Sequence, residues 1–171
     1  MANNKITLRD VEVNVRSSNF SGKAKDSQDK DGSRYFLVKL DEEQAEDLIR
    51  DGWPVRRTKD HPEIDNYVPY SYLKVFINYD AYKKGYKPEP AVYMVTKNRR
   101  TLLHEDTVGE LDGCYFEKVD ITIENAYLKR FDCWSAYLVI GFFTIQPEEL
   151  YDEYFPDVYE ENTDDDDNPF M

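Results

Sequence analysis

The sequence has few of the residues that build common catalytic and metal sites. Its 171 residues include only two cysteines, Cys114 and Cys133, and two histidines, His61 and His104. A structural zinc site needs four clustered ligands, and neither cysteine belongs to a CxxC pair, so we predict no metal site. The seven glycines occur singly, and no P-loop, GxGxxG or GxSxG motif is present.

Any catalytic site would therefore have to be built from a single nucleophile and a single base. A Cys114 nucleophile with a His104 base is conceivable, but a lone histidine in a polar turn is usually an ordinary surface residue. Carboxylate pairs in the terminal acidic run hold no fixed coordination shell for a cation. We predict that the protein is not an enzyme and needs no cofactor.

Long hydrophobic runs are also missing. No stretch of 18 apolar residues occurs, and no basic N-terminus precedes an apolar segment. We expect no membrane span and no secretory signal, and hence a cytoplasmic protein. The length is that of one domain, with enough residues to bury a core.

Basic residues are absent from Phe131 onward, although acids are abundant there. Residues 148–171 hold 11 of the 35 acids and none of the 22 bases, so 24 acids remain against 22 bases in the rest of the chain. The net charge of −13 thus lies almost entirely in this tail. Self-repulsion and low hydrophobicity predict disorder, so we divide the chain into a folded domain, 1–147, and an acidic tail, 148–171.

The tail ends in four carboxylates, Asp164, Asp165, Asp166 and Asp167, followed by Asn168 and then by Pro169, Phe170 and Met171. Most acidic termini only improve solubility. A tail used only for charge has no need of an aromatic end, so the Pro169-Phe170 pair favours a docking function.

This ending resembles that of single-stranded DNA-binding proteins of bacteria and their phages, whose acidic, disordered tails finish in Pro-Phe or an aromatic residue. The resemblance implies that Asp164–Asp167 supply charge and that Pro169 and Phe170 form an apolar plug for replication or recombination proteins. In the bacterial proteins the phenylalanine is terminal, whereas Met171 follows it here.

The remainder of the chain is similar to a phage group of these proteins. The similarity covers Tyr35-Phe36 on an early strand, the Asp51-Gly52-Trp53 turn and Arg100-Thr101-Leu102-Leu103 near the middle. It implies an OB-type barrel that coats single-stranded DNA.

Alternating apolar residues predict mainly β structure. The expected strands are 5–16, 34–40, 53–59, 72–79, 91–97, 115–124 and 134–145, the last covered on both faces because it is nearly continuously apolar. Asp41 and Gly52 bound a predicted helix over 41–51. We predict an OB-fold-like antiparallel barrel with extra strands and one short inserted helix, although composition alone equally permits a β-sandwich.

Cations and aromatic rings alternate along these strands. Rings that stack on bases, interleaved with cations that follow phosphates, are what single-strand binding without sequence preference requires. Burial of any of these rings is the competing interpretation, and Tyr35 and Trp53 fit a core equally well. The candidate DNA-binding residues are Phe20, Lys23, Arg34, Tyr35, Trp53, Arg56, Arg57, Tyr72, Lys74, Phe76, Tyr93, Lys97, Arg99 and Arg100.

The leading hypothesis is a phage protein that coats and protects single-stranded DNA in replication, recombination or repair and recruits partner proteins through its tail. Its localisation would then be the cytoplasm of the bacterial host. One alternative is an acidic DNA mimic that inhibits a host nucleic-acid enzyme, and another is a β-rich phage structural or adaptor protein. Self-association on DNA is left open by the sequence.

Overall fold

The computed structural model describes residues 4–23, 32–97 and 99–146. The acidic tail and its predicted docking residues, Asp164–Asp167, Pro169 and Phe170, lie outside this part of the chain. Both their disorder and their function therefore stay predictions. No helix in the described residues is long and apolar enough to span a membrane.

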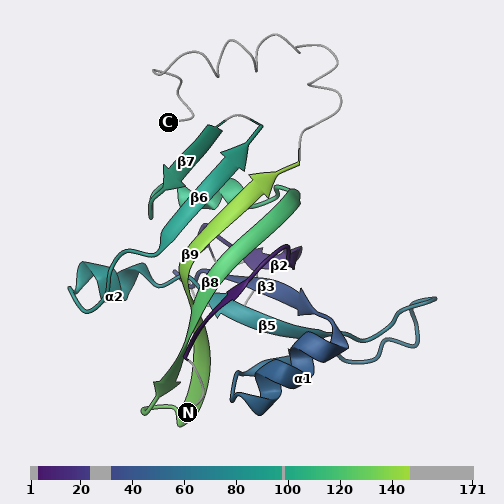
Figure 1. Ribbon diagram of the computed structural model, residues 1–171. Coiled ribbons are helices and arrows are strands. Elements are labelled where there is room, and N and C mark those ends of the chain that lie inside the picture. Colours follow the sequence, from purple (N-terminus) through teal and green to yellow (C-terminus); the bar gives the residue numbers. More distant parts are fainter. Residues whose placement is uncertain (1–3, 24–31, 98, 147–171) are drawn as a thin grey trace, which may run out of the picture.

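Six strands form a barrel at the centre of the fold (Figure 1). They are hydrogen-bonded in the order β1-β8-β9-β5-β3-β2, in which β5 and β9 are parallel and the other neighbours are antiparallel. Their bounds are Lys5–Leu8 for β1, Glu12–Asn19 for β2, Tyr35–Leu40 for β3, Ser71–Phe76 for β5, Phe116–Leu128 for β8 and Cys133–Ile145 for β9.

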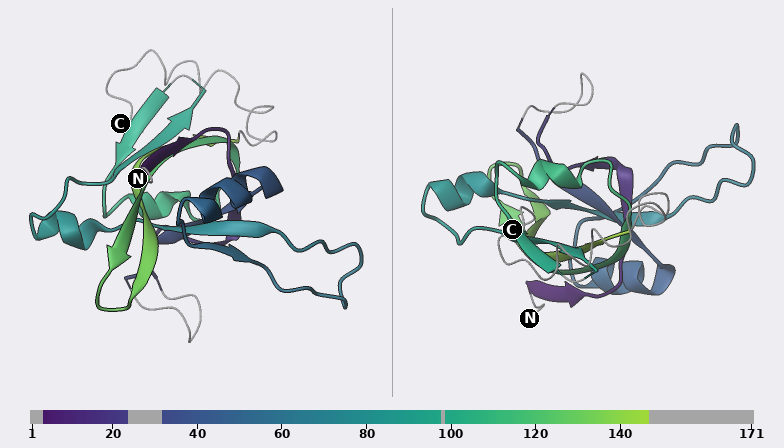
Figure 2. Two further views of the ribbon diagram at one scale, coloured as in Figure 1. Left: turned by 60° about the horizontal axis from the view of Figure 1, so that its bottom comes forward. Right: turned by 90° about the horizontal axis from the view of Figure 1, so that it is seen from above.

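The barrel closes because β1 and β2 are one kinked stretch of chain, which pairs with β8 at its start and with β3 further on. The kink is at Asp10, where φ is 51°, and Val11 N next to it donates to Val119 O at 2.9 Å. A single strand over 5–16 was expected, but the positive φ divides it in two. Counted as one, β1 and β2 complete the five-stranded OB barrel, and the predicted fold is confirmed (Figure 2).

The remaining elements are attached to this barrel. Strand β4 (Val55–Arg57) pairs with β5, and the hairpin of β6 (Ala91–Thr96) and β7 (Arg99–Leu103) extends the sheet beyond β9. The helices are α1 (Glu42–Arg50) and α2 (Tyr79–Lys83), with a 3-10 turn at Val108–Leu111. Neither β7 nor α2 was predicted from the sequence.

Helix α1 forms where the sequence predicts it. Asp41 Oδ1 accepts from Gln44 N at 2.7 Å while Gln44 Oε1 accepts from Asp41 N, which completes a capping box. Gly52, with φ of 88°, ends the helix. The chain then folds back, and Trp53 N donates to Leu48 O at 2.9 Å.

Strand β5 is shorter than its alternation suggests. The pattern continues to Tyr79, but the strand ends at Phe76 and Asn78 caps α2 by accepting from Ala81 N at 3.2 Å. A residue at the start of a helix can share the apolar character of a strand, so periodicity alone does not show the boundary.

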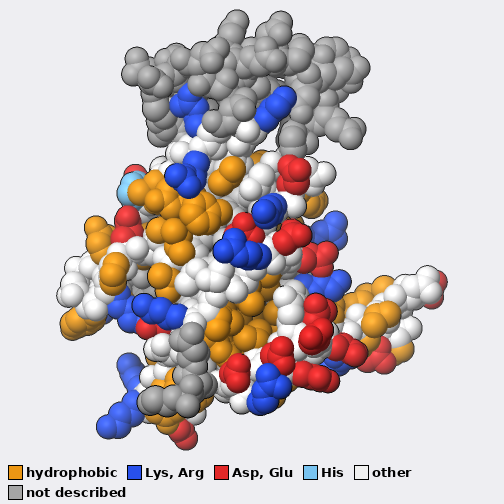
Figure 3. All heavy atoms as spheres, viewed as in Figure 1, with side chains coloured by type: hydrophobic (Ala, Val, Ile, Leu, Met, Phe, Trp, Pro, Cys, Tyr) orange, Lys and Arg blue, Asp and Glu red, His pale blue; other side chains and the backbone are white. Residues whose placement is uncertain are grey.

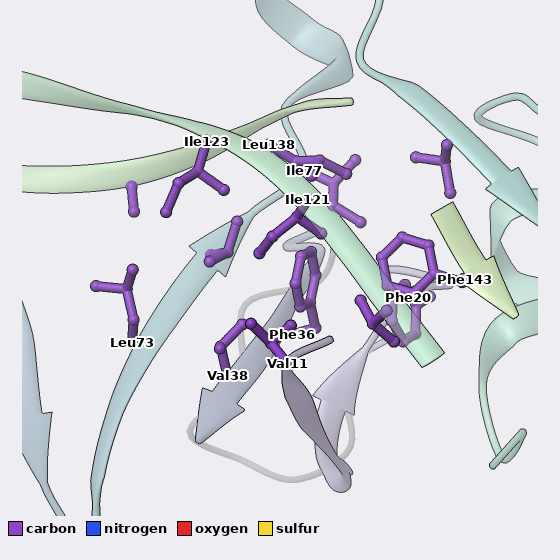
Figure 4. Packing of buried hydrophobic residues seen from close by; sticks show 14 of the residues in the cluster. Val11, Phe20, Phe36, Val38, Leu73, Ile77, Ile121, Ile123, Leu138 and Phe143 are labelled. Carbon is purple, nitrogen blue, oxygen red and sulfur yellow. The ribbon is translucent and has the colours of Figure 1, made fainter. Parts of the chain in front are cut away.

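Three phenylalanines mark the centre of the core (Figure 4). The rings of Phe20 and Phe36 are stacked at 5.7 Å, and Phe143 meets them edge-on at 5.5 and 5.4 Å. All three side chains are buried, each stabilising the fold by about 1.5–3 kcal/mol. They come from the start of the β2–β3 connection, from β3 and from β9, so their contacts pack different strands of the barrel against one another.

Candidate nucleic-acid interface

The alternation of β3 and β5 sorts their side chains between the core and the outside. Phe36, Val38, Leu73 and Val75 are fully buried. The intervening residues point outward, and the register places Tyr35 beside Phe76, Leu37 beside Lys74 and Lys39 beside Tyr72. Arg56 of β4 lies opposite Tyr72 and joins the same side. We call the outward residues Tyr35, Lys39, Tyr70, Tyr72, Lys74 and Phe76 the β3–β5 face.

Cations on the β3–β5 face lie over its rings. Lys74 Nζ is 4.0 Å from the centroid of the Tyr35 ring and 5.2 Å from that of Phe76. Lys39 Nζ lies 4.9 Å from the ring of Tyr70. The quadrupole of each ring attracts its cation by about 0.5–1 kcal/mol at exposed sites. Lys39 Nζ also lies 3.3 Å from Glu12 Oε2.

The aromatic surface continues onto β9. Parallel pairing puts Tyr137 beside Phe76, with ring centroids 6.0 Å apart. Lys87 Nζ lies 5.4 Å from the Tyr137 ring and 3.3 Å from a carboxylate oxygen of Glu124. A fourth cation–ring pair therefore follows the three on the β3–β5 face.

A second cluster lies further along β9, which we call the β6–β9 face. Tyr93 and Phe142 are register partners, and their rings are stacked with centroids 5.0 Å apart and planes inclined by 9°. The Arg100 guanidinium carbon lies 5.4 Å from one ring and 5.6 Å from the other. In Figure 3 a hydrophobic patch with basic side chains around it covers the β6 and β9 region.

A pocket separates the two faces. Strand β5 pairs with β9 at Ala136 and Tyr137, and β6 pairs with it from Ile140, so neither covers the stretch between. There the chain leaves a cavity of about 190 Å³ whose lining includes Lys5, Asn78, Lys87, Tyr137 and Val139. The two aromatic faces thus lie along the same strand, β9, with the cavity between them.

Two of the predicted stacking residues are corrected by the structure. Phe20 is 1% exposed and Trp53 is 4% exposed, so both rings belong to the core and present no face to a base. Phe20 is buried because the chain turns inward after β2, and Trp53 because it folds back beneath α1. Tyr35 is also buried, but on the outer side of the sheet, where Lys74 covers its ring.

The Arg34 side chain makes contacts within the protein. Its Nη1 donates to Phe20 O at 3.1 Å and to Ser21 O at 2.9 Å, and Nη2 lies 3.9 Å from Glu105. The guanidinium also lies 5.5 Å from the centroid of the Tyr79 ring. Burial, with nearby Glu89 as a smaller contribution, raises the pKa of Tyr79 to about 12. Arg34 therefore fixes the β2–β3 connection, and its contact with DNA stays a prediction.

The other predicted cations are distributed around the two faces. Lys97, Arg99 and Arg100 lie at the β6–β7 turn, and Arg56 borders the β3–β5 face. Arg57 points the other way and donates to Pro69 O at 3.4 Å. Lys23 is exposed at the edge of the undescribed segment 24–31.

Sequence reasoning missed Tyr70, Tyr137, Phe142, Lys39 and Lys87. Tyr137 and Phe142 lie in the nearly continuous apolar run of β9, where a register shift in the pairing with β8 disturbs the alternation. Lys39 could have been found, because it alternates with Tyr35 on β3.

No catalytic or metal arrangement accompanies this surface in the described ranges. Cys114 Sγ donates to Glu110 O at 3.2 Å, whereas His104 Nδ1 lies 3.1 Å from Glu89 Oε1. No group of three or more His, Cys, Asp or Glu side chains there is placed to hold a metal ion.

The family model described as a putative phage ssDNA-binding domain matches residues 2–169. The chain belongs to this family. The match covers almost the whole chain, including both aromatic faces and most of the acidic tail.

Solved structures of similar fold come from bacteriophage Enc34. Its single-stranded DNA-binding protein in complex with ssDNA has a TM-score of 0.51 at 11% sequence identity, with 85% of this chain and 88% of that chain covered. The same phage protein in a second structure has a TM-score of 0.48 at 10% identity, over 85% of this chain and 83% of that one. The first match shows a shared fold. No curated protein sequence matches the chain.

Proposed function

We propose that the protein binds single-stranded DNA without strong sequence preference, along the β3–β5 face and onward over Tyr137 to the β6–β9 face. The observation that carries the proposal is the set of cation–ring pairs on the outside of the barrel. In the OB fold, the second and third strands form the oligonucleotide-binding surface. Here those strands are β3 and β5, which hold the pairs of Lys74 with Tyr35 and with Phe76.

The pairs suit a strand of alternating bases and phosphates. A base stacked on an aromatic ring contributes about 1–3 kcal/mol, more than the cation it displaces. The displaced Lys74 or Arg100 ammonium or guanidinium is then within side-chain reach of a backbone phosphate. Each stacking event therefore exchanges a cation–ring contact for a base–ring contact plus a cation–phosphate contact.

The expected affinity follows from the number of contacts. Micromolar binding corresponds to about 8 kcal/mol, which two or three stacks together with several phosphate contacts supply. Ring faces accept any base, and the cations over these rings are lysine and arginine, which recognise phosphate oxygens equally in any sequence. Weak sequence preference results.

In the phage, the protein would coat and protect single-stranded DNA during replication or recombination. The acidic tail would recruit replication or recombination proteins through Asp164–Asp167, Pro169 and Phe170. Tethered to the barrel, the tail also acts at an effective concentration near the millimolar range and competes with DNA for the basic side chains of the two faces.

One titration tests the proposal. A labelled 30-mer single strand, its duplex and its RNA counterpart are each titrated with protein over a series of salt concentrations. We expect the single DNA strand to bind most tightly and its affinity to fall as salt rises. Equal binding to the duplex, or no binding to any of the three, would reject the proposed function.

A further inference from the structure

The loop over residues 58–70, here called the finger, projects from the barrel between β4 and β5 (Figures 1 and 2). Its base is fixed by Thr58 N donating to Tyr70 O at 2.9 Å and Tyr70 N donating to Thr58 Oγ1 at 3.0 Å. Nearer its end, the rings of His61 and Tyr67 meet edge-on at 4.9 Å, and Ile64 N donates to His61 O. The finger has a defined internal structure.

That structure leaves apolar side chains outside. Val68 is 73% exposed and Ile64 is 51% exposed. Acids surround them, since Asp60, Glu63 and Asp65 are all exposed and Lys59 is the only lysine or arginine of the finger. His61 Nδ1 lies 2.9 Å from Glu63 Oε1. A protrusion of this kind repels the phosphates of DNA, and its apolar side chains fit a protein surface with basic residues.

Such a surface exists on the same chain, at the end of the β8–β9 hairpin. Residues 127–134, here called the hairpin end, expose Phe131 at 64% and Trp134 at 48%. The Trp134 ring lies 5.3 Å from that of Tyr127, and Arg130 lies 5.5 Å from the ring of Phe131. Lys129 and Arg130 are exposed beside these rings, and the one acid of the hairpin end, Asp132, accepts a hydrogen bond from the Tyr127 hydroxyl. The hairpin end is thus a net basic, aromatic counterpart of the acidic, aliphatic finger.

One copy cannot bring its own finger and hairpin end together. The C-terminal end of α1 lies against the hairpin, where Asn125 Nδ2 donates to Gly52 O at 3.1 Å. The finger and the hairpin project in different directions on either side of α1 (Figure 1). The two surfaces are therefore available only to other molecules.

We propose that the finger of one copy docks on the hairpin end of the next copy along single-stranded DNA. Ile64 and Val68 meet Phe131 and Trp134, and the acids of the finger pair with Lys129 and Arg130. Because the two surfaces differ, the contact is heterologous and produces an open row of copies. The inference rests on the proposed function, since DNA brings neighbouring copies to a high local concentration and makes a small contact effective.

The first test compares a short and a long strand. A dT strand of about 10 nucleotides holds one copy, and one of about 60 nucleotides holds several. We expect the Ile64→Ser/Val68→Ser double variant to bind the short strand within about twofold of the original chain, and to need about tenfold more protein for half-saturation of the long strand. The matched control is Tyr86→Ser, which removes an equally exposed apolar side chain beyond α2 and should change neither value.

Exchanging charges between the finger and the hairpin end tests whether these two surfaces contact each other. Asp60→Lys/Asp65→Lys and Lys129→Glu/Arg130→Glu should each abolish cooperative binding to the long strand, and the four changes together should restore it. Failure of the combined variant to recover cooperativity would overturn the finger–hairpin contact. So would an equal loss of short-strand binding in the hairpin variant, because the hairpin end would then be contacting DNA.

A measurement without DNA separates this inference from the proposed function. Sedimentation velocity at increasing protein concentration should show association of the original chain that the finger and hairpin variants lack. If no copy binds the short strand but the sedimentation result holds, the proposed function fails and the contact stands. If the short strand binds normally and all variants remain cooperative, the contact is refuted.

Discussion

The Lys74 ammonium lies over the Tyr35 ring across the neighbouring strands β5 and β3, with Nζ 4.0 Å from the ring centroid. This pairing explains how an aromatic residue on the outer side of the sheet is nevertheless buried. It also means that the Lys74 side chain occupies the outer face of the Tyr35 ring. The same arrangement recurs at Tyr137 with Lys87 and at Tyr93 with Arg100.

Replacing the cation while keeping its apolar stem separates its two roles. Lys74→Met should weaken binding to dT oligonucleotides at low salt and reduce the slope of log affinity against log salt by about 0.7, the value for one phosphate contact on a single strand. At high salt the variant and the original chain should converge. The salt series is measured by fluorescence anisotropy, with Lys84→Met on the far end of α2 as the control. An unchanged slope would show that Lys74 contacts no phosphate.

The stacked pair on the β6–β9 face should carry part of the binding energy. Phe142→Ala removes one ring and should weaken binding by about 1–3 kcal/mol, which is roughly 5- to 150-fold. Tyr86→Ala, which is exposed away from this face, should leave affinity unchanged. Both variants are first compared by thermal unfolding, so that a loss of fold is not read as a loss of binding. Equal affinities for the two variants would remove Phe142 from the interface.

Phe20 distinguishes the core from the DNA surface. Because its ring is packed against Phe36, Phe116 and Phe143, Phe20→Ala should lower the free energy of unfolding by about 3–5 kcal/mol. Urea denaturation followed by tryptophan fluorescence measures this loss. A stable Phe20→Ala protein with weakened DNA binding would contradict the assignment of Phe20 to the core.

Removing the acidic tail should strengthen DNA binding. Deletion of residues 157–171 is expected to tighten binding to oligo-dT at low salt, because competition for the basic side chains of the barrel is lost. Changing Asp164–Asp167 to asparagine keeps the length of the tail and should reproduce most of the effect. If the shortened and full-length chains bind equally, the tail does not compete with DNA.

The sequence placed those residues of the candidate interface that follow simple alternation. Tyr72, Lys74 and Phe76 could be placed on one side of β5 because every second residue of that strand is buried. The OB topology could be predicted from the number of strands and the resemblance to phage proteins. The parallel pairing of β5 with β9 is a long-range contact that no local pattern encodes.

The locations of other side chains could not be predicted, because they are set by closure of the barrel. Phe20 sits in a polar segment and looks like an exposed ring, yet the turn after β2 carries it into the core. Arg34 is a cation next to a strand, but carbonyl oxygens of the β2–β3 connection lie within its reach and hold it. Tyr137 and Phe142 were hidden for the opposite reason, since a continuous apolar strand does not show which of its side chains point outward.

Photochemical crosslinking tests the central claim most directly, namely that DNA follows the β3–β5 face, Tyr137 and the β6–β9 face. A dT oligonucleotide carrying 5-iodouracil is bound at saturation, irradiated and mapped by mass spectrometry. We predict crosslinks at rings of this path, among them Tyr72, Phe76, Tyr137, Tyr93 and Phe142. Crosslinks confined to exposed rings away from it, such as Tyr86 and Tyr115, would contradict the account.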